Sequence, residues 1–156
     1  MCSGSTRYSN YKKMINYIHH KKQYLFVRDI SWNDVANQIE LEKKNDTHRA
    51  VSDETDLCID CGCVPGFMYN IYEKFKDSGY NAMHMYTSRN VGAESLGRHN
   101  DDQDVLIVQS RGRMTYKFDD NNRVTLYPGD ALSIPAWVYH NPIAIEPRIT
   151  LSFSKS

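Results

Sequence analysis

Short β-prone runs separated by turn residues fill the second half of the chain, and this pattern restricts the fold more than any other feature. The runs cover residues 80–87, 104–109, 114–118, 124–127, 131–134 and 148–153. Residues 119–122 and 128–129, which lie between runs, are the Asp, Asn, Pro and Gly residues that favour turns. Many short strands with turns between them predict a β-sandwich or jelly roll.

The first half of the chain has helical periodicity instead. Apolar residues recur at helical spacing over 11–22, 32–44 and 67–77, which predicts three short helices. Residues 24–27 are β-prone and predict a strand, whereas the polar, acidic stretch 45–60 predicts a loop. We therefore expect one domain over residues 1–156, with a helical N-terminal layer over about 11–79 packed on a β-barrel core over about 80–154.

Charge and hydropathy argue against several classes of protein. The 19 basic and 19 acidic residues cancel, so no overall field attracts nucleic acid or a membrane surface. No apolar run approaches the ~20 residues of a transmembrane helix, and the N-terminus lacks the apolar core of a signal peptide. We expect a soluble, intracellular, cytoplasmic protein with no membrane partner and no nucleic-acid partner.

Three closely spaced cysteines, Cys58, Cys61 and Cys63, suggest part of a zinc site. A zinc site needs a second Cys or His cluster at a matching distance, and the sequence offers only His48 upstream. Disulfides are not expected in a reducing compartment. Ordinary thiols in a loop are therefore the favoured interpretation, and the role of these cysteines stays open.

His99 and Asp101 lie one residue apart just before a β-prone run, and His140 follows a later strand and turn. In an extended chain, side chains at i and i+2 point to the same side, so the first two can bind one ion together. Two histidines and one carboxylate with open positions are typical of non-haem iron(II) oxygenases. Zinc, nickel and manganese accept the same ligands. Without a metal, the same residues would be a surface pair and a loop histidine.

Two longer motifs surround these residues. The first is H-x-D, a short acidic linker, an apolar strand ending in Gln, then Gly and a basic residue, over 99–113. The second is Gly-Asp, an apolar strand ending in Pro, and His140 about five residues later, over 129–140. Residues 80–154 thereby resemble the JmjC-type cupin family, particularly its branch of ribosomal-protein hydroxylases. The resemblance implies a double-stranded β-helix (cupin or jelly roll) and Fe(II)- and 2-oxoglutarate-dependent hydroxylation.

The resemblance fails at one position. In those hydroxylases a basic residue pairs with the distal carboxylate of 2-oxoglutarate, and the matching residue here is Met114. Arg113 should point to the opposite face of the strand. Arg148 lies eight residues after His140, where many other 2-oxoglutarate oxygenases carry their basic residue. We expect Arg148, with Tyr86 and Tyr116 as hydrogen-bond donors, to bind the co-substrate.

Three functions stay open at this stage: an Fe(II)- and 2-oxoglutarate-dependent dioxygenase, a metal-binding cupin with another co-substrate, and a non-catalytic cupin-like binding domain. No catalytic residue is expected beyond the three metal ligands. The prime substrate, a protein side chain or a small molecule, is not indicated. The chain ends soon after its last predicted strand, where the hydroxylases continue into dimerisation and C-terminal regions. Unpaired sheet edges allow a homodimer without requiring one.

Overall fold

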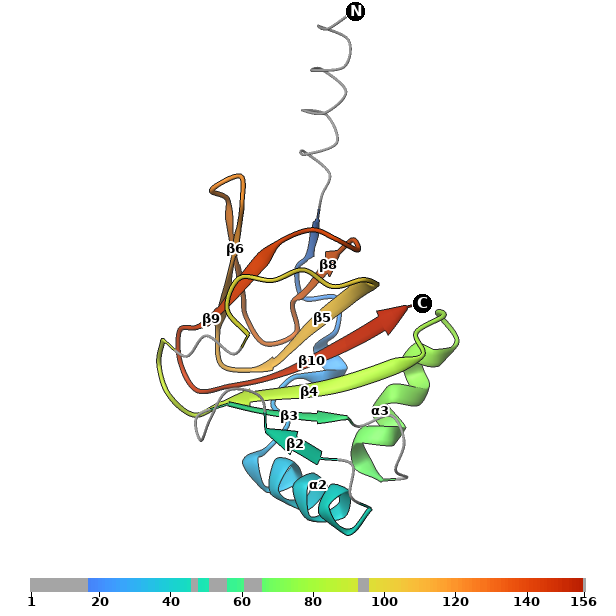
Figure 1. Ribbon diagram of the computed structural model, residues 1–156. Coiled ribbons are helices and arrows are strands. Elements are labelled where there is room, and N and C mark those ends of the chain that lie inside the picture. The colour runs from blue at the N-terminus through green and yellow to red at the C-terminus, as the bar shows by residue number, and fades with distance from the viewer. Residues whose placement is uncertain (1–16, 46–47, 51–55, 61–65, 93–95, 156) are drawn as a thin grey trace, which may run out of the picture.

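Two antiparallel β-sheets form the body of the molecule in a computed structural model that describes residues 17–45, 48–50, 56–60, 66–92 and 96–155 (Figure 1). Within these residues the larger sheet has seven strands in the order β1-β8-β5-β10-β4-β3-β2, and the smaller has three in the order β7-β6-β9. The strands are β1 (Ile18–His20), β2 (His48–Ala50), β3 (Asp56–Asp60), β4 (Ala82–Ser88), β5 (Asp104–Arg111), β6 (Met114–Phe118), β7 (Arg123–Leu126), β8 (Ala131–Ile134), β9 (His140–Ala144) and β10 (Arg148–Lys155). The predicted mainly β jelly roll is confirmed.

Strand β10 lies between β5 and β4 in the larger sheet and separates two interiors. Alternate residues of a strand point to opposite faces. One set joins the apolar cluster that the helices cover: Ile149, Leu151 and Phe153. The other set lines a pocket between the two sheets: Arg148, Thr150 and Ser152. The alternating polarity of this strand therefore separates the packing face from the face that can bind a ligand.

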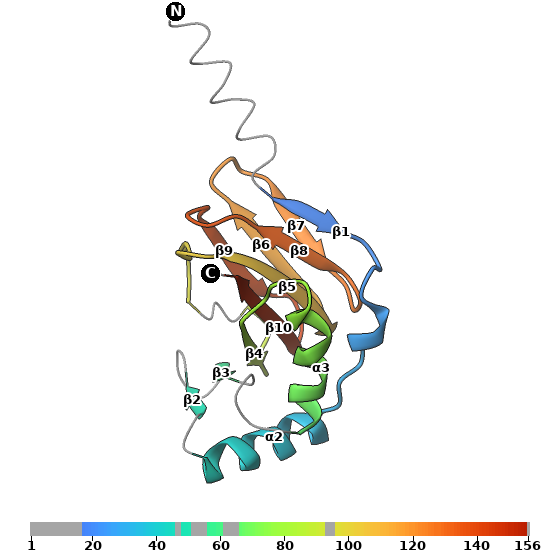
Figure 2. The same ribbon diagram turned by 90° about the vertical axis from the view of Figure 1, so that its right-hand side faces the viewer.

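Two helices, α2 (Trp32–Lys44) and α3 (Phe67–Lys76), match the predictions for these segments. They lie at the end of the molecule away from β6 and β7 (Figure 2). Helix α2 begins with a capping box in which Ser31 and Asp34 exchange side-chain-to-backbone hydrogen bonds of 3.0 Å. Helix α3 packs on β10 through Phe75, whose ring stacks on that of Phe153 with centroids 3.8 Å apart.

The predictions for the N-terminal segment were wrong where the structure describes it. Residues 18–20, expected at the end of a helix, form β1 because they pair with β8, with Ile18 opposite Ser133. Residues 25–27, expected in a strand, form the 3-10 helix η1 (Leu25–Val27). Here the aromatic side chains pack instead of entering a sheet: the rings of Tyr24 and Phe26 lie 5.7 and 5.9 Å from that of Phe75.

The predicted loop over residues 45–60 was also wrong in part, because β2 and β3 extend the larger sheet beyond β4. β3 pairs with β4, and β2 pairs with β3 at the edge of the sheet. This backbone pairing forms the strands although their sequence is polar, which is common near a sheet edge. Cys58 lies in β3, and Cys61 and Cys63 lie outside the described residues.

Strand β9 had no counterpart among the predicted strands. It contains Pro142, which lacks the N–H needed for pairing on both sides. The strand tolerates this proline because β9 is at the edge of the smaller sheet and pairs with β6 alone. Across the described ranges, the helices are all too short or too polar to span a bilayer.

Candidate metal centre

Two histidines from separate segments meet across a pair of backbone hydrogen bonds. His99 lies in the loop before β5, and His140 is the first residue of β9. The backbone N–H of each donates to the C=O of the other, at 2.9 and 2.8 Å, in an isolated antiparallel bridge. Their imidazole rings lie with centroids 4.4 Å apart. The main chain therefore holds both side chains at one point.

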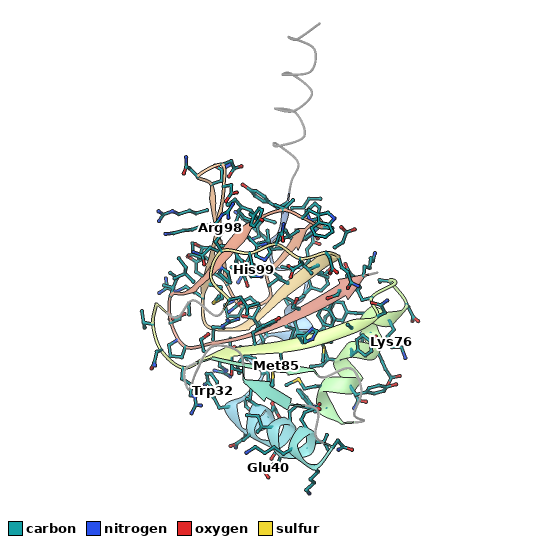
Figure 3. The ribbon with its side chains drawn as sticks, viewed as in Figure 1. Trp32, Glu40, Lys76, Met85, Arg98 and His99 are labelled. Carbon is teal, nitrogen blue, oxygen red and sulfur yellow. The ribbon has the colours of Figure 1, made fainter. Side chains whose placement is uncertain are left out.

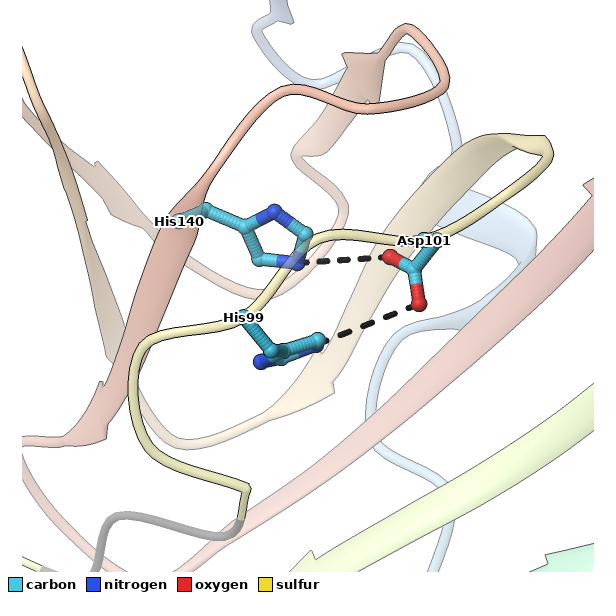
Figure 4. A group of neighbouring side chains, drawn as sticks. All are labelled: His99, Asp101 and His140. Atoms are coloured by element: carbon cyan, nitrogen blue, oxygen red, sulfur yellow. Dashed lines mark ion pairs between the residues drawn. The ribbon is translucent and has the colours of Figure 1, made fainter.

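The carboxylate of Asp101 faces both imidazoles (Figure 4). Its Oδ2 lies 3.5 Å from Nε2 of His140, and its Oδ1 lies 4.0 Å from Nε2 of His99. The backbone C=O of Asp101 accepts a 2.7 Å hydrogen bond from the N–H of Trp137, which ties it to the turn before β9. Ligand atoms of the three residues all lie within 4.8 Å of one another. The structure thus brings together the three residues predicted as metal ligands.

Backbone carbonyls fix the orientation of both rings. Nδ1 of His99 donates to the C=O of Gly97 at 2.8 Å, and Nδ1 of His140 donates to the C=O of Val138 at 3.0 Å. Because a carbonyl can only accept, the ring hydrogen lies on Nδ1 and the lone pair of the neutral ring lies on Nε2. Metal-binding histidines usually donate their other nitrogen in this way.

Burial favours the neutral form of His140. Its side chain is only 3% exposed, and this burial lowers the pKa of the imidazole. The Val138 carbonyl raises the pKa, His99 lowers it, and Asp101 raises it, but burial is the largest of these effects. A neutral imidazole is the form that binds metal ions, so a neutral His140 would not have to release a proton to bind one.

The donor set fits a divalent metal ion. Adjacent ligands at about 2.1 Å from an octahedral ion lie about 3 Å apart. The observed Nε2–Oδ separations of 3.5 and 4.0 Å exceed the length of a direct charge-assisted hydrogen bond, about 2.7–2.9 Å, and leave space between the atoms. Imidazole and carboxylate together suit iron, and also zinc, nickel or manganese.

A pocket between the two sheets contains this cluster in its wall. It holds about 430 Å³ of empty space, including its open mouth. Three residues predicted to contact the co-substrate, Arg148, Tyr86 and Tyr116, line the same pocket. The other lining residues are Leu96, Val105, Ile107, Pro142, Thr150 and Ser152. Three side chains that could hold a metal ion, one permanent positive charge and apolar walls therefore face a common space.

Arg148 is held in the pocket wall by the neighbouring strand. Its side chain belongs to a residue only 2% exposed, and its Nε donates to Oγ of Ser88 at 2.8 Å. Ser88 lies directly opposite Arg148 in the pairing of β4 with β10. The guanidinium carbon lies 5.9 Å from the ring centroid of Tyr86. A guanidinium fixed in this way suits recognition of a carboxylate.

Tyr116 supplies a hydroxyl that keeps its proton. Burial raises the pKa of Tyr116 to about 12, although the charge of Arg148 acts to lower it. The phenol is therefore a neutral hydrogen-bond donor at ordinary pH. Its ring centroid lies 6.5 Å from that of His140.

Met114, at the position of the family's basic anchor, is fully buried in the apolar cluster between the sheets. Arg113 points elsewhere, as strand alternation predicts, and its Nε lies 3.2 Å from Oε1 of Glu146 at the surface. Among the described residues that line the pocket, Arg148 is the one arginine or lysine.

Sequence reasoning missed Ser88, Thr150 and Ser152. The alternating polarity of residues 148–153 already contained the signal for the latter two, because residues at i+2 and i+4 share the face of Arg148. Thr150 donates from Oγ1 to Oε1 of the buried Gln109 at 2.8 Å, which fixes its side chain. The sequence contains no signal for Ser88, because its role depends on the register of β4 against β10.

The sequence matches no protein-family model and no curated protein. Solved structures share its fold. The structure of YcfD, a ribosomal oxygenase from Escherichia coli, in complex with cobalt and 2-oxoglutarate superposes with a TM-score of 0.63 at 19% identity, over 88% of this chain and 47% of that one. The same protein with cobalt and succinic acid gives a TM-score of 0.59 at 18% identity, over 90% and 48% of the two chains.

This chain therefore spans about half the length of the ribosomal oxygenase structures that it matches. At this identity the likeness establishes a common fold. The predicted resemblance to the cupin-type ribosomal oxygenases is confirmed at that level.

Proposed function

We propose that this chain is a metal-dependent oxygenase, and specifically an Fe(II)- and 2-oxoglutarate-dependent hydroxylase of JmjC/cupin type. One observation carries the proposal: the Nε2 atoms of His99 and His140 and the carboxylate of Asp101 converge in the wall of a pocket that also contains Arg148. In this proposal the three residues hold the ion and leave its other positions open to the pocket. The bound iron supplies the redox chemistry by which O₂ oxidises a C–H bond.

Arg148 is the reason for proposing 2-oxoglutarate as the co-substrate. Its guanidinium would bind the distal carboxylate of 2-oxoglutarate, and the hydroxyls of Tyr86 and Tyr116 would donate to carboxylate oxygens. The complexes of YcfD with 2-oxoglutarate and with succinic acid, which is 2-oxoglutarate after loss of CO₂ and oxidation, support this choice by analogy.

The remaining walls serve to exclude water. Leu96, Val105, Ile107 and Pro142 add apolar side chains to the lining of the pocket that contains the ligand cluster and Arg148. Such a lining would keep bulk water away from the site of iron-dependent oxidation. The prime substrate belongs to this proposal only as a class, either a protein side chain or a small molecule.

A second function, a metal-binding cupin with a different co-substrate, is favoured by one observation. Met114 places a buried thioether where the hydroxylases resembling this chain have their basic anchor. Under this alternative the metal ligands keep their role and Arg148 has a structural one.

Titration of anaerobic, iron-loaded protein with 2-oxoglutarate separates these functions. The proposal expects a weak visible charge-transfer band that saturates with 2-oxoglutarate and is lost in Arg148→Ala. Bound iron without a band in the wild type would reject 2-oxoglutarate and favour the second function. A protein that cannot be loaded with any divalent metal would instead be a cupin-like binding domain.

A further inference from the structure

The residues that precede the two histidines contact one another on the outer side of the barrel. Arg98 precedes His99, and Tyr139 precedes His140. The guanidinium carbon of Arg98 lies 3.9 Å from the ring centroid of Tyr139, close enough for a cation–π contact. Neighbours in extended chain point to opposite faces, so this contact lies behind the imidazole pair. Figure 3 shows Arg98 next to His99, far from Glu40 of α2.

Arg98 also contacts a third segment, the turn between β6 and β7. Its Nε donates to Oδ1 of Asp119 at 2.8 Å, and its Nη2 donates to Oδ2 at 2.6 Å. This is the bidentate geometry in which arginine binds a carboxylate most strongly. These hydrogen bonds lower the pKa of Asp119, as expected for a carboxylate held by a cation. The turn is therefore fixed to the loop that carries His99.

We propose that Arg98, Asp119 and Tyr139, called here the outer clasp, position His99 against His140 and so set the affinity of the metal centre. The inference rests on the proposed metal-binding function. An isolated exposed ion pair contributes little to stability, but a bidentate pair combined with ring stacking across three segments restricts their relative movement. A shift of the His99 loop would break these contacts together with the two bridge hydrogen bonds between His99 and His140.

The exposure of the outer clasp gives it a distinctive dependence on salt. The side chains of Arg98 and Asp119 are 55% and 54% exposed, so dissolved ions screen their attraction. The metal ligands lie in the pocket wall, where screening is weaker. Metal affinity should therefore fall as salt rises in the wild type, and fall less in a variant that lacks Arg98.

Cobalt(II) titration followed by visible absorption tests the outer clasp without any turnover. We expect Arg98→Ala and Tyr139→Ala each to raise the cobalt Kd about tenfold, the lower end of the range for residues that orient metal ligands. Arg98→Lys keeps the charge but not the bidentate geometry and should recover part of the affinity. Arg113→Ala is the matched control, because the Arg113–Glu146 pair is similarly exposed and Glu146 follows the opposite end of β9 from His140.

Hydrogen exchange of the His99 and His140 amides provides a second measurement that needs no metal. Both amides donate in the bridge, so loss of the outer clasp should speed their exchange in Arg98→Ala but not in Arg113→Ala. If the wild type bound no cobalt, the proposed metal centre would be rejected. Unchanged exchange of the His99 and His140 amides in Arg98→Ala would separately refute the outer clasp. If cobalt bound and Arg98→Ala matched Arg113→Ala in both measurements, the clasp alone would be overturned.

Discussion

Ser88 and Arg148 lie opposite each other on β4 and β10, and Nε–H of Arg148 donates to Oγ of Ser88 at 2.8 Å. We expect Ser88→Ala to raise the Kd for 2-oxoglutarate about tenfold, because the guanidinium loses the acceptor that orients it. The cobalt Kd should not change, since Ser88 is not a metal ligand. Isothermal titration with each ligand measures both constants.

The control for this variant is Ser133→Ala, which removes a hydroxyl bonded to His20 at 2.9 Å and away from the pocket. Equal 2-oxoglutarate affinities in Ser88→Ala and Ser133→Ala would contradict the assigned role of Ser88.

Asp101 and Asp102 offer a matched pair for testing the ligand set. Asp101 faces both imidazoles, whereas the next residue, Asp102, is exposed and outside the pocket lining. Asp101→Ala should weaken cobalt binding at least about 100-fold, because it removes the anionic ligand and a third of the protein donors. Asp102→Ala should bind cobalt as the wild type does. Similar affinities for the two variants would exclude Asp101 as a ligand.

Gly112 allows close packing of the β5–β6 turn against the segment that leads into Arg148. It has φ of +72°, and a Cβ there would lie 2.1 Å from the backbone oxygen of Pro147. Gly92 also has a positive φ, +81°, but a Cβ there would meet nothing within 4 Å. Gly92→Ala should lower the free energy of unfolding by about 1–2 kcal/mol, the cost of the left-handed conformation.

Gly112→Ala should lower the free energy of unfolding more than Gly92→Ala does, by roughly 3 kcal/mol or more in total, because the backbone near Pro147 must also move. Urea unfolding of both variants measures the difference. Equal losses would mean that the turn adapts to a Cβ without displacing Pro147.

Tyr116 should make stability fall at high pH. Burial raises the pKa of Tyr116 to about 12 in the folded protein, against the ordinary tyrosine value of 10.0. Between these values the unfolded chain has released the proton while the folded chain retains it, so each pH unit favours unfolding by up to about 1.4 kcal/mol. This stability is complete below pH 10 and is lost as pH rises toward 12.

Tyr116→Phe removes that titration. The difference in unfolding free energy between wild type and variant should therefore be constant below pH 10 and shift against the wild type from pH 10 to 11.5. Parallel pH profiles over this range would show that the Tyr116 phenol ionises as readily in the folded state as in the unfolded chain.

The strands from β4 onward were predictable where period-two alternation is strong. Met83 and Met85 are buried on one face of β4, and His84 and Tyr86 lie on the other, as the sequence predicts. Strand β9 escaped prediction because Pro142 argues against a strand, and only its edge position makes the proline acceptable. Strand β1 was not predicted because its sequence has helical periodicity. It forms a strand by pairing with β8, which lies over a hundred residues away in the chain.

Some features of the candidate site could also be predicted from local sequence, and others could not. His99 and Asp101 share a local spacing, so their common orientation could be predicted from the sequence alone. The contacts of Arg98 with Asp119 and Tyr139 join three separate segments and follow only from the folded barrel. Local patterns therefore indicated the proposed ligands, while the contacts proposed to orient them depend on tertiary register.

Strand β10 is the last described strand in chain order, yet it lies between β4 and β5. On the ribosome those two strands emerge earlier and cannot be joined until residues 148–155 arrive. Until then each presents an unpaired edge that can recruit another nascent chain, so aggregation competes with correct insertion. Arg148 arrives with the same strand, so the pocket gains its positive charge only when the sheet is completed.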